Sequence, residues 1–187
     1  VNSLHKETPW FIIATKNLYD DGLLREEYFK KVMENADAIE SIIDYDKDYT
    51  FDYFALTTLI RAYLLKFDNR TIERPQDLWM RVTLTVTGNE FNLDKIKETY
   101  KSLSSGMYTH ATPTLFNSGL KMQQLSSCFL IGMEDDSIEG IFNTIKDCAL
   151  ISKTAGGIGM HAHNIRGSGS RIKSTNGKSN GLIPFLK

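Results

Sequence analysis

The sequence predicts an α/β protein in two parts, a layer of helices followed by a single β-α-β unit. Apolar residues recur at helical spacing through roughly the first hundred positions. Two short apolar runs, "LSSCFLI" and "GIGMHAHNI", then flank one further helical pattern. A strand, a helix and a strand in this order imply a parallel pair joined by a right-handed crossover.

Four segments carry the helical pattern in the first part. Residues 22–43 predict one or two amphipathic helices, and "FDYFALTTLIRAYLLK" predicts another before a turn at "FDNR". Pro75 suits the first turn of the next helix, because proline lacks the N–H that this turn leaves unpaired. Asn92 is the expected N-cap of the fourth segment, and Gly106 its end. We therefore expect a helical domain over residues 1–110.

The second part, residues 111–187, is expected to begin an α/β sheet. "LSSCFLI" predicts a buried strand because it is short, apolar and bounded by polar turns. Asp136 and Glu139 are spaced like an acidic capping box before a helix that ends at a glycine pair. The sheet must continue beyond Lys187 or come from another chain, because one β-α-β unit cannot bury both of its faces.

A long polar segment, "RGSGSRIKSTNGKSNG", follows the second strand and is expected to form a functional loop. Only its "NGKS" resembles a P-loop, because Ile172 occupies the position of the first P-loop glycine. Backbone amides and basic side chains can still hold an anion here, with a plain solvated loop as the alternative. The basic side chains are those of Arg166, Arg171, Lys173 and Lys178.

Composition and charge exclude several classes of protein. The 187 residues are 41% hydrophobic and 24% charged, as in an ordinary globular protein. A net charge of -1 argues against a nucleic-acid partner. No apolar run approaches the roughly 18 residues that span a bilayer, so we expect a cytoplasmic protein without membrane contact. The valine start and the helix signals in "KSNGLIPFLK" indicate a piece of a longer protein.

The two cysteines lie in different settings. Two are too few for a disulfide scaffold and fit a reducing compartment. Cys148 lies on the apolar stripe of the predicted helix, where cysteine packs as a small hydrophobic residue. Cys128 lies in the first strand beside Ser126 and Ser127, and α/β sheets bind ligands at strand ends. A buried core cysteine is the alternative for Cys128.

Two further patterns suggest binding but have simpler interpretations. His161 and His163 share one face of the second strand, but no third ligand follows at suitable spacing, so we expect no metal. Asp135 and Asp136 most simply cap their helix. A helix N-terminus also presents amide donors, and a carboxylate beside it can accept a hydrogen bond from a sugar hydroxyl.

Several motifs, in their order and spacing, resemble the large subunit of class I ribonucleotide reductase: "THATPTLFNSG", "QLSSCFL", "EDDSIEGI", "SKTAGGIG", "IRGSGS" and "TNGKSNGLIPFL". "NSLHKET" is similar to the junction after the regulatory ATP-cone of that family. The resemblance covers essentially the whole chain and implies a ten-stranded α/β barrel behind a helical domain. The chain would then hold the helical domain and the first two barrel strands, without most of the cone and the C-terminal part of the barrel.

The resemblance also implies roles for single residues. Cys128 matches one of two cysteines that reduce the ribose and become a disulfide. Thr112 and Ser127 match contacts to the substrate diphosphate and ribose. The other matching residues bind a specificity effector, a deoxyribonucleoside triphosphate or ATP: Asp136, Ser137, Ile138, Lys153, Arg166, Lys173 and Ser174.

The reaction implied by the resemblance converts ribonucleoside diphosphates to deoxyribonucleoside diphosphates through a thiyl radical. The radical forms on another cysteine through a metal-containing small subunit, and thioredoxin or glutaredoxin re-reduces the disulfide. No cofactor is expected to bind this chain directly. The helix after Asp136 is expected to pair with its mate in a homodimer. The adenosylcobalamin-dependent class shares some of the motifs and is the alternative on cofactor.

Essential parts of the family's active site lie outside this sequence. The radical cysteine, its neighbouring asparagine and glutamate, and the second reducing cysteine are downstream in the family. We therefore expect the chain to be inactive alone, as a shortened large subunit or as one piece of a split enzyme. A nucleotide-effector-binding and dimerisation module, or a nonfunctional remnant, are the alternatives.

Overall fold

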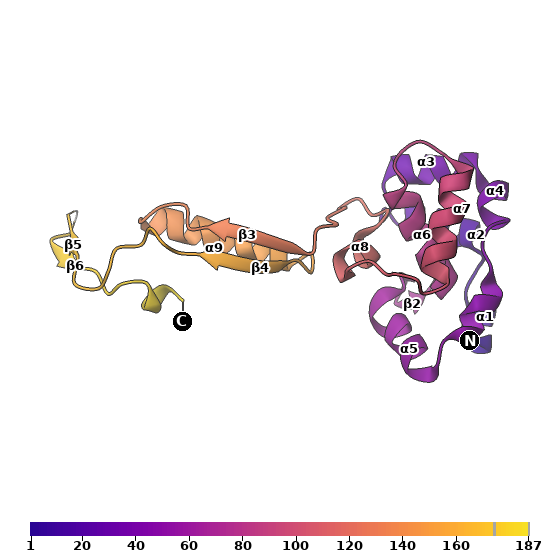
Figure 1. Cartoon of the computed structure of the whole chain (residues 1–187), viewed down its shortest axis with the longest axis horizontal. Coiled ribbons are helices and arrows are strands. Elements are labelled where there is room, and N and C mark those ends of the chain that lie inside the picture. Colours follow the sequence, from indigo (N-terminus) through magenta and orange to yellow (C-terminus); the bar gives the residue numbers. More distant parts are fainter. Residues whose placement is uncertain (174, 187) are drawn as a thin grey trace. The chain divides into compact units, whose positions relative to one another are not determined.

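The computed structural model describes residues 1–173 and 175–186 and contains two compact units. A helical unit runs from Val1 to Leu125, and a second unit begins at Ser126. Figure 1 shows helices in the first unit, and strands with one long helix in the second. Packing therefore divides the chain after Leu125, whereas the functional division at residue 110 stays a prediction.

The helical unit is built around one buried helix, α6 (Pro75–Val86) (Figure 1). Every residue of α6 from Pro75 to Leu84 is buried, and α7, η1 and α8 pack against it. This arrangement confirms the predicted helical domain. The other elements are α1 (Asn2–Glu7), α2 (Phe11–Asp20), α3 (Glu26–Glu34), α4 (Ala36–Glu40), η1 (Tyr45–Thr50), α5 (Tyr53–Thr58), η2 (Leu59–Tyr63), β1 (Lys66–Phe67), β2 (Arg70–Thr71), α7 (Leu93–Ser104) and α8 (Thr112–Asn117).

The start of α6 is fixed by polar groups that are themselves buried. Pro75 is its first residue, and Asp77 accepts a hydrogen bond from the Arg74 backbone N–H at 2.8 Å. The Tyr45 hydroxyl donates to the other Asp77 oxygen at 2.7 Å. Burial raises the pKa of Asp77 to about 7, because water no longer solvates the charged carboxylate. The Arg74 guanidinium lies 4.3 Å from the Trp10 ring centre and 4.8 Å from that of Tyr45, at cation–π distance.

A buried ion pair joins three segments of the helical unit. Arg81 of α6 donates to both Glu73 oxygens, at 2.5 and 3.1 Å, and both side chains are at most 3% exposed. Arg81 also donates to the Ser118 carbonyl at 2.8 Å, and Glu73 accepts from the Leu65 N–H at 2.9 Å. The chain after α8 and the chain before β1 are therefore tied to α6. This bond to Ser118 is one reason that residues after 110 pack with the helical unit.

Several sequence-predicted features of this unit are confirmed. Asp68 and Asn69, at φ of 50° and 60°, make the tight turn of "FDNR" between β1 and β2, in the left-handed region that Asp and Asn tolerate. Asn92 caps α7, because its side chain accepts from the Lys95 N–H at 3.0 Å. Gly106 follows α7 with φ of 70°. The predicted helix before the turn is α5, which continues into the π-helix η2.

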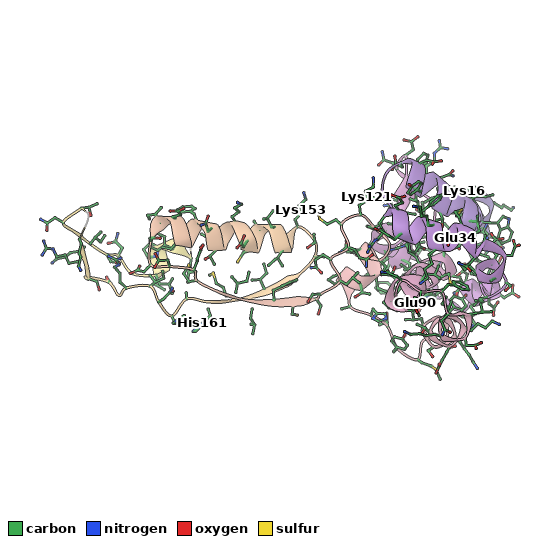
Figure 2. All side chains as sticks on the ribbon, turned by 90° about the horizontal axis from the view of Figure 1, so that it is seen from above. Lys16, Glu34, Glu90, Lys121, Lys153 and His161 are labelled. Atoms are coloured by element: carbon green, nitrogen blue, oxygen red, sulfur yellow. The ribbon has the colours of Figure 1, made fainter. Side chains whose placement is uncertain are left out.

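The second unit contains the predicted β-α-β arrangement. β3 (Cys128–Gly132) and β4 (Gly157–His161) are parallel, with Cys128 opposite Gly157 and Gly132 opposite His161. α9 (Ile138–Ser152) connects them and lies on one side of the strands only (Figure 2). Among the described residues this sheet has two strands and is open, as expected for the beginning of a barrel.

The first strand is not buried, contrary to the prediction from its apolar sequence. Phe129 and Ile131 are half-buried, and α9 packs on β3. Cys128 and Leu130 alternate with them along the strand and are exposed, Leu130 by 94%. The apolar run of β3 is typical of a strand that is covered on both faces. Among the described residues, only α9 covers it, and on one face.

Ser137, rather than Asp136, caps α9. The Ser137 hydroxyl accepts a hydrogen bond from the Gly140 N–H at 3.0 Å. The predicted capping box between Asp136 and Glu139 is therefore wrong. Asp136 instead pairs with Arg166, a residue 30 positions away that local sequence spacing could not identify.

The polar segment after β4 contains a short hairpin. β5 (Arg171–Ile172) pairs antiparallel with β6 (Gly177–Lys178). Asn176, at φ of 57°, lies in the connection and accepts a hydrogen bond from Arg171 at 3.0 Å. A short 3-10 helix, η3 (Ile183–Phe185), follows. Strands of two residues are too short to produce a hydrophobic period, so the sequence predicted only a loop here.

Candidate functional site

A hollow of about 740 Å³ lies at the N-terminal end of α9 in the second unit. The start of α9, the residues after β4, the β5–β6 hairpin and η3 form its walls. Its apolar lining consists of Ile138, Ile141, Ile165, Ile172 and Phe185. Its polar lining consists of Asp136, Ser137, Arg166, Ser170, Arg171, Lys173 and Ser179. Such a lining suits a ligand that has both an apolar ring and charged groups.

Asp136 and Arg166 form a partly buried ion pair beside this hollow. The Arg166 Nε lies 2.5 Å from Asp136 Oδ2, and Arg166 Nη2 donates to the Asp136 carbonyl at 3.0 Å. The Arg166 side chain is 34% exposed and that of Asp136 26%, so solvent still screens the pair. Two of the guanidinium's nitrogens are thus engaged, and the orientation of Arg166 is set by Asp136.

The turn that carries Asp136 is held closely against the first turns of α9. The Thr144 hydroxyl accepts from the Glu134 N–H at 3.1 Å and donates to the Gly140 carbonyl at 2.8 Å. The Asp135 backbone lies directly over Gly140, where a Cβ would come within 2.7 Å of the Asp135 nitrogen. The glycine of "EDDSIEGI" is therefore required by close backbone contact.

Gly140→Ala is expected to loosen the start of α9, although alanine normally stabilises a helix by about 1 kcal/mol relative to glycine. The added Cβ would contact the Asp135 nitrogen, side chain and carbonyl at 2.7 to 2.9 Å, so the turn must shift. We expect a loss of about 1 to 3 kcal/mol, seen as faster hydrogen exchange of the α9 amides. Gly132→Ala is the control, because nothing lies within 4 Å of its added Cβ. Slower exchange in Gly140→Ala would contradict this account.

The charges at the hollow favour an anionic ligand. Arg166, Arg171 and Lys173 line it against the single carboxylate of Asp136. The N-terminus of α9 adds its partial positive charge and the amides of its first turn. A phosphate group is therefore attracted to this end of the helix, while the isoleucine side chains offer a surface for a base or sugar.

Lys153, predicted to bind the same ligand, does not line the hollow within one chain. It is the C-cap of α9, one helix length away from Ser137. A helix of this length spans about 22 Å. Figure 2 shows Lys153 at one end of α9 and His161, the last residue of β4, toward the opposite end.

The predicted basic loop is only partly at the hollow. Arg171 and Lys173 line it, whereas Lys178 of β6 is not among its lining residues. Ser174, also predicted to bind the effector, lies outside the described residues. Sequence reasoning missed Ser170, Ser179 and the apolar residues after Ile138, because segments distant in sequence bring them together.

The Cys128 sulfur lies on the open face of the sheet. Cys128 is exposed and forms no disulfide within the described residues, so it is not a core residue. Cys128 of β3 pairs with Gly157 of β4. A Cβ added at Gly157 would lie 3.7 Å from the Cys128 sulfur. Gly159 lies on the same face of β4. Gly157 has no side chain to cover the sulfur, whereas the Leu130 side chain lies over Gly159. Cys148, on α9, is half-buried.

The two predicted substrate contacts belong to different units. Thr112 is the first residue of α8 in the helical unit and is half-buried. Ser127 is exposed at the start of the second unit, and its carbonyl accepts from the Gly157 N–H at 2.7 Å. That bond extends the β3–β4 ladder to the residue before Cys128.

Two histidine rings lie together at the end of β4 and just after it. The His161 and His163 rings are stacked, with centres 4.3 Å apart and planes at 19°. Within residues 1–173 and 175–186, no group of three or more His, Cys, Asp or Glu side chains is placed to hold a metal ion. In the same part of the chain, no helix is both long and apolar enough to cross a bilayer.

Comparison with known protein families matches both parts of the chain. Residues 49–123 match the all-alpha domain of ribonucleotide reductase. Residues 126–187 match the barrel domain of the same enzyme. The division between the two matches coincides with the division between the two compact units.

Individual relatives extend this similarity to the whole chain. The chain is 46% identical over 197 residues to ribonucleoside-diphosphate reductase large chain 2 of Saccharomyces cerevisiae, with all of the chain and 22% of the relative covered. It is 49% identical over 202 residues to the large subunit of Trypanosoma brucei brucei, covering all of the chain and 24% of the relative. For the large chain of Cryptosporidium parvum the identity is 53% over 165 residues, or 88% of the chain and 20% of the relative. The chain thus spans about a fifth to a quarter of the length of these relatives.

Proposed function

The chain belongs to the ribonucleotide reductase large-subunit family, and on this premise we propose that it supplies two parts of a ribonucleoside-diphosphate reductase. One part is the reducing thiol of Cys128. The other is an effector site for a deoxyribonucleoside triphosphate or ATP in the hollow at the N-terminal end of α9. The observation that carries the proposal is the Asp136–Arg166 pair beside a cationic, partly apolar hollow.

The lining of the hollow supports a division of roles in effector binding. Arg166 uses Nε and Nη2 for Asp136, which leaves Nη1 for a phosphate oxygen. Arg171 and Lys173 add positive charge, and the amides after Ser137 add donors. Among the described residues none donates to Asp136 Oδ1, so this oxygen can accept from a sugar hydroxyl. Ile138 and its apolar neighbours then contact the base.

We further propose that α9 pairs with the same helix of a second copy. Ile138, Phe142 and Ile145 recur at helical spacing and are 63%, 59% and 40% exposed. An antiparallel pair would bury this stripe and bring the C-terminal end of one helix to the N-terminal end of the other. Lys153 of the partner subunit would then reach the hollow, which accounts for its distance from Asp136 within one chain.

The proposed role of Cys128 is to deliver electrons to the 2' carbon of the ribose. A radical on another cysteine, outside this chain, removes the 3' hydrogen and returns it to the 3' carbon at the end of the reaction, and the 2' hydroxyl leaves as water. Cys128 and a second thiol, also outside this chain, supply two electrons and two protons and become a disulfide. The exposed sulfur, with Gly157 opposite it, suits both the ribose and a thioredoxin or glutaredoxin that restores the thiols. A small subunit with a metal centre would generate the radical, and a reducing cytoplasm would keep the thiols available.

Nucleotide-dependent stabilisation of the chain tests the effector site. At a dTTP or dATP concentration of 100 times the dissociation constant, binding should stabilise the folded chain by about 2.7 kcal/mol, measured as a rise in the thermal midpoint. Asp136→Ala should remove most of this rise, because the Asp136 carboxylate no longer holds the Arg166 guanidinium in place beside the hollow. Asp147→Ala is the matched control, since Asp147 is an exposed carboxylate on the same helix. An equal rise in both variants would refute the site.

A second candidate function is an effector-binding and dimerisation module without catalysis. The exposed stripe of α9 favours it, because this surface needs only a second copy of the chain. Nucleotide-dependent stabilisation without any contribution to turnover would support this candidate over the enzymatic one.

A further inference from the structure

The Thr112 hydroxyl has one neighbouring hydroxyl in the structure, that of Tyr63. The two oxygens lie 3.3 Å apart, and either atom has the geometry to donate. Both side chains are half-buried in the helical unit. Among the described residues no other side chain is bonded to the Thr112 hydroxyl, so Tyr63 alone sets its orientation.

Tyr63 reaches Thr112 because of a local irregularity in its helix. It is the last residue of the π-helix η2, which directly follows α5. The Leu64 N–H donates to the Leu59 carbonyl at 2.9 Å, a bond that spans five residues instead of four. Single π-helical turns inside helices are often found at functional sites, because the extra residue changes which way the following side chains face. Here Leu64 is buried in the core while Tyr63 faces α8.

A second contact fixes the Tyr63 ring against the helix that carries Thr112. The ring lies over that of Phe116 in α8, with centres 4.8 Å apart and planes at 46°. Ring packing therefore positions Tyr63 without help from its hydroxyl. The hydroxyl is left with Thr112 as its bonding partner, and removal of this single oxygen should preserve the packing.

The direction of the hydroxyl bond decides what Thr112 can offer to a ligand. If Thr112 donates to Tyr63, its only proton is occupied. If Tyr63 donates to Thr112, the Thr112 proton is available to an acceptor such as a phosphate oxygen. An anionic acceptor selects this second direction, and each bond in such a chain polarises and strengthens the next.

We propose that Tyr63 is a positioning residue that orients the Thr112 hydroxyl as a donor to the diphosphate of the substrate. This inference rests on the proposed function, in which Thr112 contacts that diphosphate. Tyr63 itself touches neither the substrate nor the reacting atoms. Its loss should weaken substrate binding without changing the chemical step.

The test is steady-state kinetics of the full-length large subunit that contains this segment, assayed with its small subunit and a ribonucleoside diphosphate. Tyr63→Phe should raise KM about two- to tenfold and leave kcat within about twofold, as for the loss of one hydrogen bond. Thr112→Val should raise KM at least as much. The double variant should resemble Thr112→Val alone, because the Tyr63 hydroxyl acts only through Thr112. Tyr53→Phe is the control, since this tyrosine of α5 is 86% exposed.

The outcomes separate this inference from the function on which it rests. An unchanged KM in Tyr63→Phe, with a raised KM in Thr112→Val, would overturn the positioning role alone. An unchanged KM in both variants would overturn the assignment of Thr112 to the diphosphate. A full second increase in the double variant would mean that Tyr63 acts independently of Thr112, which also overturns the inference. Equal thermal midpoints for Tyr63→Phe and the unchanged protein would confirm that ring packing is preserved.

Discussion

Cys128→Ser is expected to abolish deoxyribonucleotide formation when the chain is combined with a polypeptide that carries the missing cysteines and with the radical-generating subunit. A serine hydroxyl is close in size to the thiol but cannot be oxidised to a disulfide, so the two electrons for the 2' carbon are missing. Product should fall to the level of a mixture without the chain, even in a single turnover.

Cys148→Ser is the matched control for this experiment. Cys148 lies half-buried on α9, whereas Cys128 is exposed on the sheet. The control should retain turnover with at most a modest loss of stability. Turnover that survives Cys128→Ser would exclude a reducing role for this sulfur. If the unchanged chain restores no turnover but still binds nucleotide, the effector and dimerisation module becomes the better description.

Arg81→Met is expected to destabilise the helical unit by about 3 to 5 kcal/mol. The substitution leaves the Glu73 carboxylate buried without its cation, and it removes the donor to the Ser118 carbonyl. Most of the stability of a small domain is then lost. Urea denaturation followed by tryptophan fluorescence measures the effect, because Trp10 and Trp79 both lie in this unit.

The control is an ion pair with the same separation on the surface. Lys30 Nζ and Glu26 Oε1 also lie 2.5 Å apart, but their side chains are 64% and 61% exposed. Glu26→Gln should change the stability by less than about 0.5 kcal/mol, because water solvates the remaining charge. Similar losses in Arg81→Met and Glu26→Gln would contradict the importance of burial.

The sequence predicted the elements whose signals are local. Asn92, Pro75 and the "FDNR" turn each act on backbone groups within a few residues, so their types alone identify a cap, a helix start and a turn. The order of strand, helix and strand was likewise visible, because hydrophobic spacing depends only on neighbours in the chain.

The sequence did not predict the contacts that join distant segments. Asp136 is a residue type that often caps helices, yet it forms an ion pair with Arg166, and Ser137 is the N-cap of α9. The bond between Tyr63 and Thr112 was missed for the same reason. The hairpin of β5 and β6 was missed because its two-residue strands are too short to produce a hydrophobic period. The family resemblance pointed to Asp136, Arg166 and Lys173, which line the hollow, and to Lys153, which lies at the other end of α9. Their roles in effector binding stay predictions.

The two-stranded sheet also determines how the chain behaves in solution. Among the described residues, β3 and β4 pair only with each other, so the outer edge of each strand presents unpaired N–H and C=O groups. The exposed Leu130 lies on the open face of β3, one of these two edge strands. Free edges next to apolar side chains recruit strands from other molecules. Self-association should therefore increase with concentration, and strands that complete the barrel would suppress it by occupying the same edges.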